Sequence, residues 1–87
     1  MKIKEGFVLR TVGGVDIIVA VGKRTKEING VMTLNKTGAF IVKRIFNGKS
    51  REEIVKEYSS EYEVDNITAE NDYELFEKKL KEAGLAE

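Results

Sequence analysis

Chemistry in this 87-residue chain has to come from carboxylates, lysines, tyrosines and hydroxyl groups, because the sequence contains neither histidine nor cysteine. It therefore lacks the commonest general base and metal ligand, and it has no disulfide, thiolate zinc site or cysteine nucleophile. No carboxylate cluster has calcium-loop spacing, and Gly13-Gly14 lies outside the strand-to-helix context of a phosphate-binding loop. We expect no catalytic residues, no bound metal, no cofactor and no enzymatic activity from this chain alone.

The charge balance argues against nucleic acid as a partner. Fifteen basic and fifteen acidic residues give a formal net charge of zero, whereas non-specific affinity for nucleic acid comes largely from Lys and Arg. Residues 65–87 carry seven acidic residues against three lysines, a net charge of −4 that phosphate would repel. A small basic cluster of Lys23, Arg24 and Lys26 lies in the polar segment 22–30. That cluster is either a solvated loop or a contact for an acidic surface.

The length and the distribution of apolar residues indicate one small domain. A chain of 87 residues has room for a single modest core. No apolar run approaches the roughly 20 residues that span a bilayer, and residues 1–5 lack the apolar region of a signal peptide. We expect a single domain over residues 1–87, a cytoplasmic location and no membrane contact.

A strand-to-helix stretch at residues 31–48 organises the predicted fold. The apolar and β-branched residues at 31–34 predict a short strand, and Asn35 is suited to cap the helix that follows. Gly48 suits the left-handed conformation at the end of that helix. Between these caps the apolar residues recur at helical spacing and are expected to be buried: Ala39, Phe40, Ile41, Val42, Ile45 and Phe46.

A β-hairpin is predicted before this stretch. Two apolar, β-branched runs at residues 7–12 and 15–21 are joined by Gly13-Gly14, and both glycines tolerate positive φ. The second run is apolar at nearly every position, which indicates cover on both faces or a strand flanked by two neighbours. The polar segment after it is expected to form a loop with Ile28 turned inward.

A second helix is predicted from a capping-box pattern, in which Ser50 is the cap and Glu53 reaches back to it. The pattern then breaks at residues 59–64, where Tyr62 and Val64 are expected to fill the core. The helix should last about two turns and bury three side chains: Ile54, Val55 and Tyr58.

The last helix is predicted to begin at a cap provided by Asp65 or Thr68 and to end at Gly84. Asp65, Glu70 and Asp72 are expected to form an acidic first turn that complements the helix dipole. One narrow sector of this helix is apolar and is expected to face the core: Ala69, Tyr73, Phe76, Leu80 and Ala83.

These elements predict an α+β fold, a three-stranded antiparallel β-meander followed by three α-helices in a winged helix-turn-helix-like arrangement. Such a fold permits a small DNA-binding regulator, in which a helix enters the major groove. The last helix is the natural candidate by chain order. Its acidic character opposes that role, so DNA binding is the weaker alternative.

Four motifs follow one another in a characteristic order along the chain: Phe7-Val8-Leu9-Arg10, Met32-Thr33-Leu34-Asn35-x-Thr37-Gly38-Ala39-Phe40-Ile41, Gly48-Lys49-Ser50-x-Glu52-Glu53-Ile54 and Val64-Asp65…Ala69-x-x-Asp72…Phe76…Leu80…Ala83-Gly84-Leu85. Together they resemble the PqqD family over nearly the whole sequence. The Leu-Asn-x-Thr-Gly-Ala segment is the most specific of them.

The resemblance implies a recognition element of ribosomally synthesised, post-translationally modified peptide pathways. Such an element holds the leader segment of a precursor peptide and presents the peptide to a modifying enzyme, often a radical SAM enzyme. In the family the leader is added as a further antiparallel strand at the edge of the third strand, against the last helix. The peptide-binding residues implied here are Gly30, Val31, Met32, Thr33 and Leu34 on the strand, and Asp72, Leu75 and Lys79 on the helix.

The side chains at that site have alternative roles. Leu75 is either an apolar anchor for a leader side chain or an ordinary exposed leucine, while Asp72 and Lys79 are placed to pair with leader charges. Met32 is expected to pack into the core unless its side chain faces the cleft. The free edge of the third strand could also pair with another copy of the chain, so a homodimer remains an open expectation.

Overall fold

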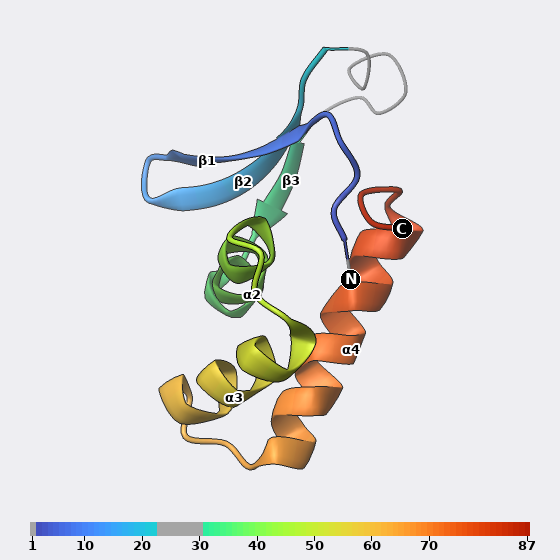
Figure 1. Cartoon of the computed structure of the whole chain (residues 1–87). Helices are drawn as coiled ribbons and strands as arrows, with labels where there is room; N and C mark the ends of the chain where they lie inside the picture. Colours follow the sequence, from blue (N-terminus) through green and yellow to red (C-terminus); the bar gives the residue numbers. More distant parts are fainter. Residues whose placement is uncertain (1, 23–30) are drawn as a thin grey trace.

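The computed structural model describes residues 2–22 and 31–87. The loop expected at residues 22–30, with Ile28 and the basic cluster, lies outside them from residue 23 onward. The described residues form three strands and then three helices, with the sheet at one end of the molecule and α4 running along its side (Figure 1). The elements are β1 (Phe7–Val12), β2 (Val15–Ala20), β3 (Val31–Leu34), α2 (Lys36–Phe46), α3 (Arg51–Glu61) and α4 (Asn66–Glu82).

The sheet is the expected antiparallel meander with the order β1-β2-β3. Gly13 and Gly14 adopt φ values of 57° and 79°, so the two-residue hairpin turn needs the left-handed backbone that glycine tolerates. β2 lies between two neighbouring strands, which is one of the two arrangements expected from its continuous apolar sequence. One end of its outer face is open, since Val15 is 42% exposed.

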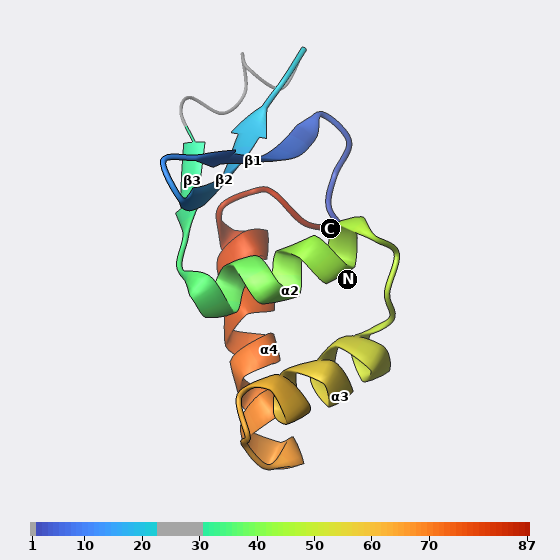
Figure 2. The same cartoon turned by 90° about the vertical axis from the view of Figure 1, so that its left-hand side faces the viewer.

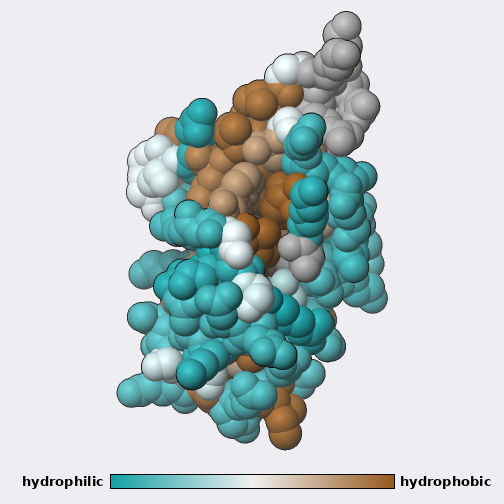
Figure 3. All heavy atoms as spheres, in the orientation of Figure 1, coloured by the Kyte–Doolittle hydropathy of each residue, from teal (hydrophilic) through white to brown (hydrophobic). Residues whose placement is uncertain are grey.

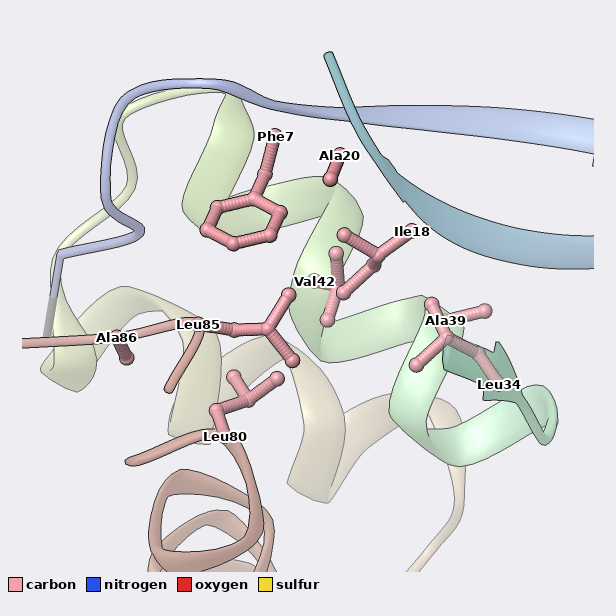
Figure 4. Packing of buried hydrophobic residues seen from close by; sticks show 9 residues of the cluster. All are labelled: Phe7, Ile18, Ala20, Leu34, Ala39, Val42, Leu80, Leu85 and Ala86. Atoms are coloured by element: carbon pink, nitrogen blue, oxygen red, sulfur yellow. The ribbon is translucent and has the colours of Figure 1, made fainter. Parts of the chain in front are cut away.

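The first core cluster joins the sheet to α2 and to the end of α4. In the register of the sheet Ile18 lies opposite both Leu9 and Met32, so these side chains share the inner face. Figure 4 shows Ile18 beside Val42, with Leu80 and Leu85 approaching from below. The buried members of the cluster are Phe7, Ile18, Ala20, Leu34, Ala39, Val42, Leu80, Leu85 and Ala86.

A second cluster holds the three helices together. Ile41 lies on the side of α2 away from the sheet, and it packs with buried residues of α3 and α4. Because α2 contributes to both clusters, it fixes the sheet relative to α3 and α4. The buried members are Ile41, Ile54, Val55, Tyr58, Ala69 and Tyr73, with Tyr62 and Val64 packed against them as expected.

The predicted helix caps are confirmed. The Asn35 Oδ1 atom accepts a hydrogen bond of 2.8 Å from the Gly38 N–H. Ser50 and Glu53 form both bonds of a capping box at the start of α3. Asp65, rather than Thr68, caps α4, since the Asp65 side chain accepts the Thr68 N–H at 2.7 Å. Each cap satisfies a backbone N–H that has no partner within its helix.

Two residues expected in the core are exposed. Phe46 is the last residue of α2 and is 39% exposed. Ala83 is the C-cap of α4 and faces solvent, because Gly84, with φ 79°, turns the chain immediately after it. After that turn, Leu85 and Ala86 are the residues that enter the first core cluster, and they are 4% and 5% exposed.

Two helix descriptions are also corrected. α3 spans 11 residues, about three turns rather than two, and runs through Ser59 and Ser60 to Glu61. Serine is only a moderately poor helix former, and the Ser59 hydroxyl donates a 2.6 Å hydrogen bond to the Val64 carbonyl, which fixes the turn after the helix. The first turn of α4 contains no acidic residue beyond its cap.

The two ends of the described chain pair with each other. The Lys4 N–H donates to the Leu85 carbonyl at 2.9 Å, and the Glu87 N–H donates to the Lys2 carbonyl at 3.1 Å. Ile3 and Ala86 form the bridge between them. Among the helices of the described residues, none has the length and apolar content that a membrane span requires.

Candidate functional site

β3 is an edge strand, and its second edge is open within the part of the chain that the structure describes. It pairs with β2 on one side only, in the register Asp16↔Leu34 to Val19↔Val31. Figure 2 shows β3 at the outer side of the sheet, running directly into the first turn of α2. An open edge carries unpaired backbone N–H and C=O groups that can accept another strand.

The side chains of β3 contribute less to this edge than its backbone does. Leu34 is 6% exposed and belongs to the first core cluster. Met32 is half-buried and packs against the same cluster, which is the core role considered for it from the sequence. Thr33 is exposed on the opposite face. For Val31 only the backbone is described, and Gly30 lies outside the described residues.

A hollow of about 280 Å³ opens beside the end of β3. Asn35, the residue directly after β3, lines one wall, and the three residues proposed on α4 line the other. Asp72, Leu75 and Lys79 are thus brought together at one site, which the strand reaches through Asn35. The full lining comprises Asn35, Thr37, Gly38, Ile41, Tyr58, Asp72, Leu75, Phe76 and Lys79. We call this space between the start of α2, α3 and α4, beside the end of β3, the edge cleft.

A glycine in α2 permits the close approach of Phe76 at the base of the edge cleft. A Cβ atom at Gly38 would lie 2.8 Å from Phe76 Cε1, a separation that side chains do not tolerate without movement. Gly38 is buried, and Phe76 packs against both core clusters. Glycine therefore lets α4 approach α2 closely at a position where helix propensity alone would favour alanine.

Polar groups in the edge cleft carry charges of both signs. The Tyr58 hydroxyl donates a 2.8 Å hydrogen bond to Asp72 Oδ2. Burial, together with this bond to the carboxylate, raises the pKa of Tyr58 to about 12, so the hydroxyl remains a donor at neutral pH. Lys79 is exposed and makes no ion pair with the residues described. Leu75, 62% exposed, forms an apolar rim beside it.

Sequence patterns assigned four of the lining residues to a cap or to the core rather than to a site: Asn35, Ile41, Tyr58 and Phe76. Thr37 and Gly38 were marked only by the Asn-x-Thr-Gly segment of the family motif. The convergence of all these residues depends on how α3 and α4 pack against α2, which residue spacing along one helix does not encode.

The arrangement is suited to bind an extended peptide. A strand edge supplies repeating hydrogen-bond groups, and the adjoining cleft offers one apolar rim, an anion and a cation. Among the residues described, no group of three or more carboxylates could hold a metal ion.

Comparisons with known proteins give one family and two similar structures. Residues 10–86 match the family described as coenzyme PQQ synthesis protein D (PqqD). The structure of TbiB1 in complex with the TbiA(beta) leader peptide aligns with a TM-score of 0.84 at 28% identity, covering 100% of this chain and 95% of that one. Lasso peptide synthetase B1 complexed with the leader peptide aligns with a TM-score of 0.82 at 27% identity, covering 99% and 95% respectively. No curated protein matches the sequence.

Proposed function

This chain belongs to the PqqD family, and on that premise we propose that it binds the leader segment of a ribosomally synthesised precursor peptide. The leader would add a fourth, antiparallel strand to the open edge of β3. The observation that carries this proposal is the open edge of β3 together with the edge cleft, whose lining starts at Asn35 directly after the strand and includes Asp72, Leu75 and Lys79. Both similar structures hold a leader peptide.

Main-chain hydrogen bonds would supply much of the affinity, and the edge cleft would supply the sequence preference. We infer that the backbone of residues 30–34 pairs with the leader. Met32 and Leu34 would act indirectly, because their side chains pack in or against the first core cluster and hold the strand in place. We therefore expect β3 to pair with many different leader sequences, and the edge cleft to select among them.

The α4 residues of the edge cleft have distinct roles in this proposal. Leu75 would anchor an apolar leader side chain, because it is a large apolar residue exposed at the rim. Lys79 would pair with an acidic leader residue. One carboxylate oxygen of Asp72 accepts the hydrogen bond from Tyr58. The other oxygen would accept a hydrogen bond from a basic or hydroxyl-bearing residue of the leader.

The proposed role is to bind and present the peptide rather than to catalyse its modification. The leader would be held at β3 while the core segment of the same precursor peptide reaches a separate modifying enzyme. We expect that enzyme to be a radical SAM enzyme. We infer a cytoplasmic setting, where precursor peptides are synthesised. A second copy of this chain would compete with the leader if it paired through the same edge.

An NMR titration tests the proposal, using a leader peptide from a precursor gene adjacent to the gene of this chain. We expect chemical-shift changes concentrated in residues 30–35 and at Asp72, Leu75 and Lys79. Shifts confined to α3, or produced only by DNA, would contradict leader binding at the edge cleft and favour the alternative of a DNA-binding regulator.

A further inference from the structure

A second hollow lies at the other end of α2. It measures about 410 Å³, and its apolar floor is formed by Phe7, Ile45 and Phe46, with Lys2, Lys4 and Lys49 around the rim. Figure 3 views the molecule from this side, where brown atoms lie in a recess below the sheet with teal atoms beside it. We call this space the lysine-rimmed hollow.

The floor of the lysine-rimmed hollow exposes an aromatic side chain that the fold does not use. Phe46 is 39% exposed although it continues the apolar sequence of α2. Ile45 beside it packs against the first core cluster, and Phe7 is 6% exposed. A large apolar group in a concave, partly desolvated position is the kind of surface that accepts a partner side chain.

The rim carries an excess of positive charge in a chain that is neutral overall. The pairing with residues 85–87 holds residues 2–4 extended, so Lys2 and Lys4 leave the backbone on the same side. Neither lysine forms an ion pair within the described parts of the chain. Lys49 forms ion pairs with two carboxylates, those of Glu57 at 3.6 Å and Glu53 at 3.9 Å, so the uncompensated positive charge of the rim comes from Lys2 and Lys4. Against these three lysines, one carboxylate lines the hollow, that of Glu5.

We propose that the lysine-rimmed hollow is a docking site for an acidic segment of a partner protein, which inserts one large apolar side chain against Phe46. Charge complementarity selects the acidic segment, and the apolar floor selects the anchor. A concave site with few cations suits a protruding side chain better than it suits a flat anionic membrane, which is bound through larger basic surfaces.

This site is independent of the edge cleft. The two hollows share no lining residue, and they open toward opposite ends of α2, where Asn35 and Phe46 lie roughly 16 Å apart along the helix axis. A leader bound along β3 therefore leaves the lysine-rimmed hollow open. The two sites together would allow one chain to hold a peptide and a partner protein at the same time.

Selection from a phage-displayed library of random linear peptides, with the full 87-residue chain as the target, tests the proposal directly. We expect enrichment of acidic peptides that contain Phe, Trp, Leu or Ile. The Phe46→Asp variant should bind a selected peptide at least about tenfold more weakly than the parent. A double variant, Lys2→Glu with Lys4→Glu, should also bind that peptide more weakly. The double variant keeps the test informative if Phe46→Asp disturbs the fold.

Matched substitutions elsewhere serve as controls. Ile67 is 74% exposed at the far end of α4, and Lys56 is exposed on α3, so Ile67→Asp and Lys56→Glu should leave peptide affinity unchanged. The proposal is overturned if no acidic peptides are enriched or if the rim and floor variants bind them as well as the parent. It is also overturned if Leu75→Asp abolishes binding, because the peptides would then occupy the edge cleft. Binding of anionic vesicles in place of peptides would overturn it in favour of a lipid surface.

Discussion

The hydroxyl of Tyr58 on α3 donates a 2.8 Å hydrogen bond to the carboxylate of Asp72 on α4, at the base of the edge cleft. This bond connects the helix pair that supports the cleft to a residue proposed to contact the leader. It makes Asp72 both a structural partner and a candidate binding group, and the two roles can be separated by mutation.

Removal of the Tyr58 hydroxyl should destabilise the fold modestly. We expect Tyr58→Phe to lower the free energy of unfolding by about 0.5–1.5 kcal/mol, because a half-buried carboxylate oxygen loses its donor while the ring packing remains. Urea denaturation measures the change. Tyr62→Phe is the control, since the Tyr62 hydroxyl makes only a 3.5 Å contact with the Lys36 carbonyl. Equal effects of the two substitutions would argue against a special role for the Tyr58–Asp72 bond.

Alkaline pH should destabilise the protein through its buried tyrosines. The pKa of Tyr58 is raised to about 12 by burial and by Asp72, and burial also raises the pKa of Tyr73. The folded state therefore holds the hydroxyl protons of Tyr58 and Tyr73 more tightly than the unfolded chain, in which tyrosine has a pKa of about 10. The contribution of these protonated tyrosines to the free energy of unfolding is complete below about pH 10 and is lost as pH rises toward about 12.

In denaturation experiments at a series of alkaline pH values, Tyr58→Phe should lose stability less steeply than the parent, with Tyr73 accounting for the remaining slope. An unchanged slope would show that Tyr58 titrates normally in the folded state.

Alanine at position 38 should destabilise the parent protein but stabilise a variant in which Phe76 is replaced by a smaller residue. A Cβ at position 38 would lie 2.8 Å from the Phe76 ring, and overpacking of this kind costs about 1–3 kcal/mol. That cost exceeds or cancels the roughly 1 kcal/mol by which alanine is the better helix former.

We therefore expect Gly38→Ala to lower the unfolding free energy in the parent and to raise it in a Phe76→Leu background. A double-mutant cycle measures this coupling. Additive effects would show that the two residues do not constrain each other.

Leu75 should contribute to leader affinity without supporting the fold. It is 62% exposed, so Leu75→Asp should leave the unfolding free energy nearly unchanged while weakening leader binding by about tenfold or more. Isothermal titration calorimetry measures the affinity. Ile67→Asp is the control on the same helix, because Ile67 is also exposed but lies outside the edge cleft. Unchanged affinity of Leu75→Asp would remove Leu75 from the site.

Local sequence patterns predicted the parts of this fold that depend on neighbouring residues. The glycine pair fixed the hairpin, and Asn35, Ser50 and Asp65 marked helix starts, because turns and caps are made within a few residues. The pairing of the first two strands followed from the short connection between them.

Features that depend on tertiary packing were predicted less well. Phe46 and Ala83 fit the apolar spacing of their helices, yet each lies where its helix leaves the core, and spacing alone does not show where cover ends. The α4 residues of the edge cleft were proposed through the family resemblance. Gly38 and Phe76 were not, because their contact joins residues 38 positions apart.

Pairing of a leader peptide with β3 as a strand can be measured by residue-resolved hydrogen exchange. In a strand addition the outward-facing amides of β3 gain hydrogen-bond partners, so alternate residues within 31–34 should exchange more slowly when the leader is bound. Binding by the edge cleft alone would leave these amides unchanged. We expect alternating protection along β3 that is lost without the leader, and uniform exchange of β3 with bound leader would contradict strand addition.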